Sequence, residues 1–240
     1  MTRFLLVGLT LFSKMKSGSI GIPVGEDSLV DTEIFTVERE GAELKRSIKT
    51  NPPATTPSGH RIVEGTIAIE QQVEYEESEI DGNGNVQSES RYRKVAERAQ
   101  FIQVPNQFVI LESGAPSMMF DILGRTTDCA YEPAEIDIDG FILDQEEPSL
   151  WMLGFYEHGT QAENGTLYGS DIADDPIASD ILQDSACNQV GIEHFYSDDA
   201  VKARASESGY IEVYSPDYEV EEFTDYLVDV LASHINRPTV

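Results

Sequence analysis

Imidazole and carboxylate side chains recur through the second half of the chain, and both groups bind divalent metal ions. They would converge on one ion if the strands of this half lie side by side. Acids are so frequent, 44 Asp and Glu in 240 residues, that any histidine has some nearby in sequence. Solvated loops and a helix start are therefore the favoured interpretation. The candidate ligands are His158, Asp171, Asp174, Asp175, Glu193 and His194.

Two shorter patterns also resemble metal sites. Asp31 followed by Glu43-Leu44-Lys45 resembles the Asp…Glu-x-Lys pattern of metal-dependent nucleases, but residues 42–48 equally predict a short helix. Asp81-x-Asn83-x-Asn85 resembles the start of a calcium loop, although the sixth and twelfth positions lack the glycine and glutamate that such a loop needs. Neither pattern is specific enough to assign a metal.

The sequence holds no phosphate-cradle, nucleophile-elbow or zinc-protease motif, and no cofactor is predicted. Cys129 and Cys187 lie 58 positions apart and fit no metal-ligand spacing, so two buried thiols are expected. No spacing identifies a base that would make Cys129 a nucleophile. Asn164-Gly165-Thr166 fits a glycosylation acceptor, but a hairpin turn explains the same residues.

The charge balance is strongly acidic. Lys and Arg number 16, the formal net charge is −28, and 40% of the residues are hydrophobic, which is enough for a folded core. Because molar salt shortens the screening length to about 3 Å, such a surface stays hydrated in brine without strong self-repulsion. With six lysines, the composition resembles that of haloarchaeal cytosolic proteins, which implies a halophilic, archaeal, cytoplasmic protein. The alternative is an acidic mesophilic protein that binds cations or basic partners.

Direct nucleic-acid binding is not expected, because it needs clustered Lys and Arg side chains and the sequence has only one modest cluster of them. If Asn83-Gly84 forms a two-residue type I′ turn, the hairpin pairs this cluster with its own acids. That turn would place Glu76 opposite Arg91, Glu74 opposite Arg93, and Tyr75 opposite Tyr92. The basic cluster is Arg91, Arg93, Lys94 and Arg98.

Alternating apolar and polar residues predict an α+β fold of antiparallel, hairpin-rich sheets with a C-terminal amphipathic helix packed on the sheet. We expect an N-terminal α+β unit with a long hairpin over residues 1–128 and a C-terminal α+β unit over 129–240, or one continuous domain. Phe4–Leu9 predicts a buried strand and not a signal peptide. The sequence contains no run of about 20 apolar residues, so no membrane-spanning helix is predicted. Strands are expected at 33–37, 67–75, 101–111 (two strands about a turn), 151–156, 190–196, 201–205 and 210–214; helices at 116–123, ended by Gly124, at 175–182 and at 215–231; and loops at Ser17–Ser19, Pro23 and 51–59.

Two functions stay open at this point. Exposed strand edges and the lack of a catalytic motif favour a non-catalytic binding or assembly protein, acting with a protein partner or as a homo-oligomer. The alternative is a metal-dependent hydrolase or nuclease whose ligands are scattered along the sequence.

Overall fold

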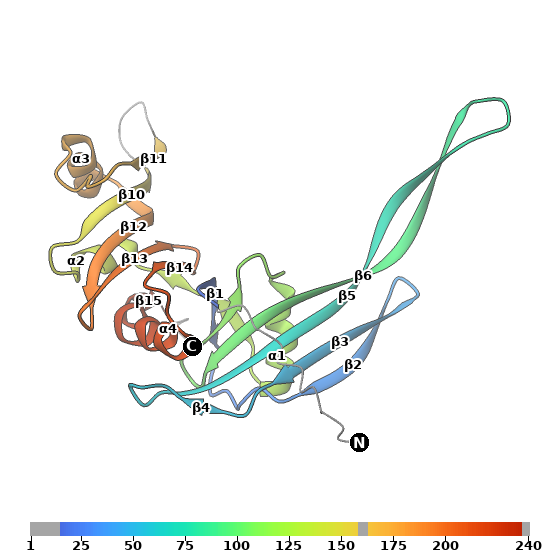
Figure 1. Cartoon of the computed structure of the whole chain (residues 1–240), viewed down its shortest axis with the longest axis horizontal. Helices are drawn as coiled ribbons and strands as arrows, with labels where there is room; N and C mark the ends of the chain where they lie inside the picture. Colours follow the sequence, from blue (N-terminus) through green and yellow to red (C-terminus); the bar gives the residue numbers. More distant parts are fainter. Residues whose placement is uncertain (1–14, 158–162, 237–240) are drawn as a thin grey trace, which may run out of the picture.

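The computed structural model describes residues 15–157 and 163–236, so the strand expected at Phe4–Leu9 lies outside the described residues. Antiparallel strands dominate, and the helices are few and short (Figure 1). The strands are β1 (Ser17–Pro23), β2 (Glu33–Arg39), β3 (Ala42–Thr50), β4 (Ala54–Thr55), β5 (Arg61–Ile80), β6 (Val86–Val104), β7 (Phe108–Glu112), β8 (Tyr131–Pro133), β9 (Glu135–Ile136), β10 (Ser149–Tyr156), β11 (Asn164–Tyr168), β12 (Ala186–Tyr196), β13 (Asp199–Ser206), β14 (Tyr210–Ser215) and β15 (Ile235–Asn236). The helices are α1 (Met118–Thr127), α2 (Ile138–Leu143), α3 (Pro176–Asp184) and α4 (Val220–Tyr226), the last followed by a π-helical turn (Leu227–Leu231) and a 3₁₀ turn (Ala232–His234).

A single sheet connects the two halves of the described chain, and β1 lies near its middle. β1 pairs with β14 on one side and with β7 on the other, so strands before and after residue 128 belong to the same sheet. The division into two units stays a prediction. The strand order is β11-β10-β12-β13-β14-β1-β7-β6-β5-β3-β2, with β4 paired to β5, β8 paired to β1, and a separate β9–β15 pair. The strands expected from residue 33 onward are confirmed as β2, β5, β6 with β7, β10, β12, β13 and β14.

β1 corrects the expectation of a loop at Ser17–Ser19 and Pro23. Its glycines fit the crowded centre of the sheet: a Cβ on Gly18 would lie 2.2 Å from the carbonyl oxygen of Leu111. A Cβ on Gly21 would lie 2.5 Å from the ring of Phe120. Glycine here permits close approach within a strand, whereas composition alone assigns it to a turn.

β3 replaces the short helix expected over residues 42–48. The turn Glu40-Gly41 joins it to β2, and both turn residues have positive φ, 52° and 76°, as a type I′ turn requires. Leu44, Arg46 and Ile48 are buried and alternate with more exposed neighbours, which is the period of a half-buried strand.

α1 begins after Pro116 as expected, but it does not end at Gly124. That glycine is buried inside the helix, where a Cβ would lie 2.4 Å from the carbonyl oxygen of Cys129. The helix ends instead at Asp128, whose φ of 54° places it in the left-handed conformation that commonly terminates helices. Gly124 therefore allows the backbone at Cys129 to pack closely against the helix, and it does not terminate the helix.

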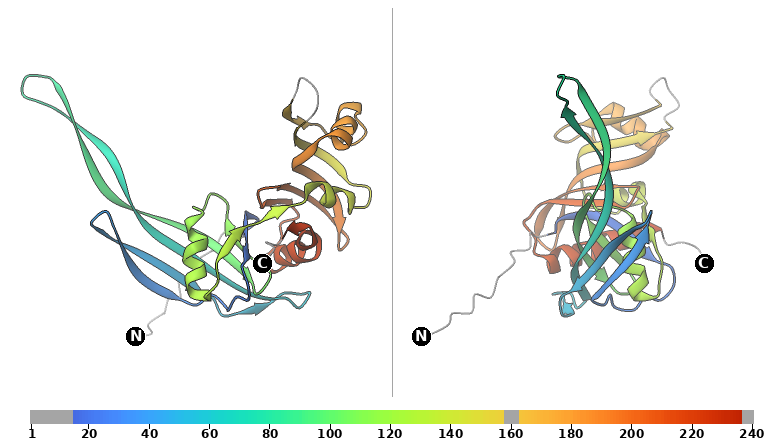
Figure 2. Two further views of the ribbon diagram at one scale, coloured as in Figure 1. Left: turned by 180° about the vertical axis from the view of Figure 1, so that it is seen from behind. Right: turned by 90° about the vertical axis from the view of Figure 1, so that its right-hand side faces the viewer.

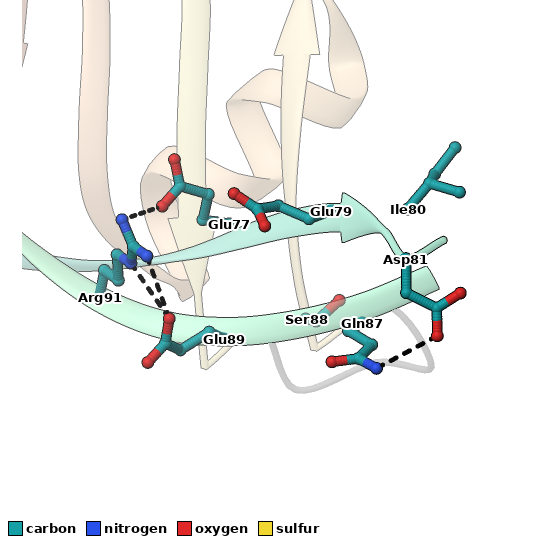
Figure 3. Close-up of a pocket in the computed structure, with 8 residues that line it drawn as sticks. All are labelled: Glu77, Glu79, Ile80, Asp81, Gln87, Ser88, Glu89 and Arg91. Carbon is teal, nitrogen blue, oxygen red and sulfur yellow. Dashed lines mark hydrogen bonds and ion pairs between the residues drawn. The ribbon is translucent and has the colours of Figure 1, made fainter. Parts of the chain in front are cut away.

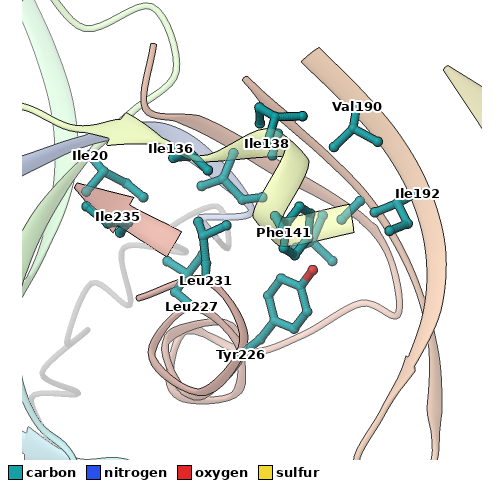
Figure 4. Close-up of a cluster of buried hydrophobic side chains, with 14 of the residues drawn as sticks. Ile20, Ile136, Ile138, Phe141, Val190, Ile192, Tyr226, Leu227, Leu231 and Ile235 are labelled. Atoms are coloured by element: carbon teal, nitrogen blue, oxygen red, sulfur yellow. The ribbon is translucent and has the colours of Figure 1, made fainter. Parts of the chain in front are cut away.

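The C-terminal helix shares a core with the second half of the sheet. Leu227 and Leu231 are fully buried and lie in one cluster with Val190 and Ile192 of β12 (Figure 4). Phe223, also fully buried, belongs to the same cluster. Full burial of each such side chain stabilises the fold by about 1.5–3 kcal/mol. The predicted apolar stripe is confirmed, although the helix begins five residues later than expected. The architecture is an α+β arrangement dominated by antiparallel sheet.

Candidate functional site

The β5–β6 hairpin extends well beyond the rest of the sheet (Figures 1 and 2). β3 pairs with β5 only as far as Ile69, and β7 pairs with β6 only from Phe101 onward. Beyond these points, residues 70–80 and 86–96 continue as a two-stranded ladder that ends at the pair Ile80–Val86. We call this projecting part the ribbon. Among the described residues, no strand pairs with either edge of the ribbon, and edges of this kind can accept a further strand.

The ribbon has no hydrophobic core beneath it. Val73 and Tyr92 are 39% and 59% exposed, and the guanidinium of Arg93 lies 5.5 Å from the centre of the Tyr75 ring. An isolated two-stranded hairpin is only marginally stable in water. A partner that covered the ribbon would therefore stabilise it.

The tip of the ribbon exposes an apolar pair. The carboxylate of Asp81 accepts the N–H groups of Asn85 at 2.9 Å and Asn83 at 2.8 Å, which lowers the pKa of Asp81 and holds the turn. Beside this turn Ile80 and Val86 face one another across the strands and are 75% and 67% exposed. A shallow hollow of about 230 Å³ lies next to them, lined mainly by polar and acidic side chains of the last ribbon residues (Figure 3).

The expected register of this hairpin is wrong by one residue. Of the two turn residues predicted, only Gly84 has positive φ (84°), and a five-residue turn replaces the two-residue turn at Asn83-Gly84. Tyr75 therefore pairs with Arg91, which was expected opposite Glu76. Because successive side chains point to opposite faces, a shift of one residue exchanges the faces of the expected partners. The observed pairs are Val73–Arg93, Glu74–Tyr92, Tyr75–Arg91 and Glu76–Ser90.

The basic residues of β6 still find partners within the chain. Arg91 forms ion pairs with Glu77, two residues along the same face, and with Glu89 (Figure 3). The ammonium group of Lys94 donates to the carbonyl oxygen of Glu43. Exposed pairs of this kind contribute at most about 1 kcal/mol each. The prediction against nucleic-acid binding stays a prediction.

The metal-ligand candidates do not converge in the part of the chain that the structure describes, where no group of three His, Cys, Asp or Glu side chains is placed to hold an ion. His158 lies outside the described residues. His194 is buried, and its Nε2 lies 3.0 Å from the hydroxyl of Tyr226. Burial lowers the pKa of His194, so the imidazole is neutral in the core.

The remaining members of that set have local roles. Asp175 caps α3, where its carboxylate accepts a first-turn N–H at 2.8 Å, as its position before Pro176 predicts. Asp171 and Asp174 are exposed in the loop before α3. Glu193 forms an ion pair with Lys202 of the neighbouring strand.

The nuclease-like pattern is also dispersed. Asp31 is exposed before β2, while Glu43 and Lys45 lie exposed on β3. The N–H of Lys45 donates to the carboxylate of Glu70 at 2.8 Å, which ties β3 to the base of the ribbon. Glu43 and Lys45 are part of the β2–β3 hairpin. No three His, Cys, Asp or Glu side chains among the described residues are placed to hold an ion.

Both cysteines are free and buried, as predicted. Burial, together with the nearby Asp139 carboxylate, raises the pKa of Cys187 to about 12, so this thiol stays protonated. Asn164 and Gly165 begin β11 and pair with Tyr156 and Phe155, so these two residues belong to a strand and not to the turn expected there.

A buried polar network that sequence reasoning missed fixes the segment before β2. The amide of Gln103, which is fully buried, donates to Asp27 Oδ2 at 2.7 Å and accepts the N–H of Val30 at 2.8 Å. The hydroxyl of Tyr131 donates to the same carboxylate oxygen at 2.8 Å, and burial raises the pKa of Tyr131. A lone glutamine in an apolar run, Phe101 to Val104, is the one signal that would have suggested a buried polar partner.

A second polar cluster, also missed, joins the loop before β5 to the C-terminal helix. Asp225 is 4% exposed and accepts the N–H of Ser58 at 2.9 Å, a contact between residues 167 positions apart. Asp229 accepts the hydroxyl of Tyr196 at 2.6 Å and lies 3.6 Å from Nε2 of His60. No spacing in the sequence predicts contacts of this range.

No family model, curated protein or solved structure matches this chain. None of the helices in the described residues is long and apolar enough to cross a membrane.

Proposed function

We propose that this chain is a non-catalytic binding or assembly protein and that the ribbon is the element that binds its partner. The observation that carries the proposal is the pair of unpaired strand edges along residues 70–80 and 86–96, which end in the exposed side chains of Ile80 and Val86. Exposed edges accept strands from a partner. An apolar tip gains about 25 cal/mol for each Å² that a partner covers.

We also infer that the acidic surface is a solvation device for molar salt, in keeping with a halophilic, cytoplasmic protein. A directly opposed pair of carboxylates supports this inference: Glu38 lies opposite Glu43 in the β2–β3 hairpin. Like charges in direct cross-strand pairs destabilise a sheet in dilute buffer. Salt above about 1 M screens that repulsion within about 3 Å.

The proposal is tested with a chain that lacks the ribbon. Glu70 and Ala96 are paired, so replacing residues 71–95 by Asn-Gly joins them through a two-residue turn and keeps the pairing of Ile69 with Glu97. Mass is measured by size exclusion with light scattering in molar KCl, alongside analysis of co-purifying proteins. Circular dichroism checks that the shortened chain folds.

We expect the full chain to form an oligomer or a complex, and the shortened chain to be a folded monomer without a partner. A full chain that is strictly monomeric and has no co-purifying partner would overturn the proposal. So would a shortened chain that keeps its partner, because the binding element would then lie elsewhere.

A further inference from the structure

We propose that the partner of the ribbon is a second copy of the same chain, added edge to edge so that β5 of one ribbon lies beside β6 of the next. This inference rests on the proposed function and names the partner of that site. It follows from how charge is divided between the two strands, how the ribbon edges end, and where the apolar tip lies.

The two strands of the ribbon carry opposite charges. Residues 70–80 of β5 contain five glutamates and no basic residue, whereas residues 86–96 of β6 contain three basic residues and one glutamate, Glu89. In a protein with a net charge of −28, a strand segment with a positive net charge is a local exception. Within the hairpin, the acidic segment of β5 lies along one side of β6, and a second copy would place another such segment along its free edge. The glutamates of β5 are Glu70, Glu74, Glu76, Glu77 and Glu79, and the basic residues of β6 are Arg91, Arg93 and Lys94.

This division selects one of the three ways in which two ribbons can share an edge. Pairing of β5 with β5 would place glutamates beside glutamates, and pairing of β6 with β6 would place arginine and lysine side chains beside one another. Pairing of β5 with β6 sets opposite charges together, which favours neighbouring strands, whereas like charges disfavour them. The same arrangement lets the unpaired backbone groups of each edge bond to the other.

The tip fixes the direction of the added ribbon. When two ribbons point the same way, β6 of one runs antiparallel to β5 of the next, as β5 and β6 do within one hairpin. The exposed Ile80 of one copy then lies near the exposed Val86 of the next, and a row of tips forms a continuous apolar strip. Opposed ribbons would leave each tip in water.

An interface between two different edges is heterologous, because each copy keeps one edge free. Such an interface continues into a closed ring when the rotation between copies closes, and into a filament when it does not. The chain is therefore expected to form assemblies larger than a dimer.

Cysteine pairs test the arrangement. Ser78 of β5 and Ser88 and Ser90 of β6 are exposed, and serine to cysteine changes neither charge nor size appreciably. Each chain carries one substitution, Ser78→Cys, Ser88→Cys or Ser90→Cys, and is oxidised alone or mixed. A disulfide needs Cα atoms within about 7 Å, which adjacent strands about 4.8 Å apart satisfy and strands two places apart do not. The wild-type chain, with Cys129 and Cys187 buried, is the control.

We expect disulfide-linked dimers when Ser78→Cys chains are mixed with Ser88→Cys or Ser90→Cys chains, and none from any single variant. Efficient linkage of one variant with itself would overturn the arrangement, and so would a lack of linkage in both mixtures. If a different protein co-purifies and is lost with the ribbon while no mixture links, the proposed function holds and self-assembly is refuted. A partnerless monomer refutes both.

Charge exchange gives an independent test. Glu77 and Glu79 lie on the same face of the ribbon as Arg91 and Arg93. Glu77→Lys with Glu79→Lys in one chain, or Arg91→Glu with Arg93→Glu in another, is expected to weaken self-association about tenfold or more, because neighbouring strands then carry like charges on that face. Mixing the two variants restores opposite charges and assembly. Glu132→Lys with Glu146→Lys, both exposed and away from the ribbon, changes net charge equally and is expected to leave assembly intact. Equal weakening by this control, or no recovery on mixing, would overturn the proposal.

Discussion

Replacement of Gln103 by leucine is expected to loosen the segment before β2, because this side chain holds that segment on the sheet. Its amide donates to Asp27 Oδ2 at 2.7 Å and to the carbonyl oxygen of Ser28 at 2.7 Å, and it accepts the N–H of Val30 at 2.8 Å. Leucine has a similar volume, so the change removes hydrogen bonds and opens little space.

The magnitude follows from which groups keep a partner. Asp27 keeps the Tyr131 hydroxyl and the N–H of Asn106, so it loses one charge-assisted bond, about 1.5–3 kcal/mol. The N–H of Val30, a residue that is 2% exposed, is left without a partner at a cost of about 1–3 kcal/mol. Ser28 is exposed, and water replaces the amide there. Together these two losses lower the free energy of unfolding by about 2.5–6 kcal/mol.

Urea unfolding followed by circular dichroism at constant molar KCl measures this loss, with Gln107→Leu as the control on the neighbouring turn. We expect the control to change the free energy by less than about 0.5 kcal/mol, since its side chain is only half-buried. Hydrogen exchange of the Val30 amide should accelerate selectively. A Gln103→Leu chain within about 1 kcal/mol of wild type, with Val30 still protected, would refute the role assigned to the network.

Three further predictions concern the core and the surface. Leu227 is fully buried in the π-helical turn after α4, and Leu227→Ala is expected to lower the free energy of unfolding by about 2–5 kcal/mol in the same urea assay. A smaller loss would contradict the core that this turn shares with the sheet. Burial lowers the pKa of His194 below its usual value of about 6.5, so the stability that the neutral imidazole contributes is complete above that pH and is lost as the pH falls. His194→Gln should therefore reduce the drop in unfolding free energy between about pH 7.5 and 5.5, and an unchanged drop would count against this role. Circular dichroism should show unfolding when KCl falls from about 3 M to 0.1 M, where the screening length reaches about 10 Å, and a fold that is equally stable in dilute buffer would contradict the salt-adapted surface.

Local patterns predicted those elements whose structure depends on near neighbours. The alternation around Ile67 and Tyr75 predicts a strand, and β5 is one. The cap at Asp175 and the stripe from Phe223 to Leu231 likewise predict helices that the structure contains. In each of these elements, the residues that decide the conformation lie within a few positions of one another.

The expectations from sequence were wrong where a segment distant in the chain decides the local conformation. Gly18 was expected in a loop, but it lies in β1, where a Cβ would be 2.2 Å from the carbonyl oxygen of Leu111 in β7. The register of the ribbon depends on how Asp81 holds its turn, and a shift of one residue changes every cross-strand pair. The candidate metal ligands among the described residues do not converge, since proximity in sequence does not by itself bring side chains together.

Composition and short-range periodicity act through near neighbours, and they predict the acidic surface, the dominance of antiparallel strands and the positions of most elements. Three features are visible only in the folded chain: β1 joins both halves in one sheet, β5 and β6 extend beyond their neighbouring strands, and Asp27, Gln103 and Tyr131 meet. These features depend on which distant strands pair and where their pairing stops, and that choice is made by packing across the whole chain.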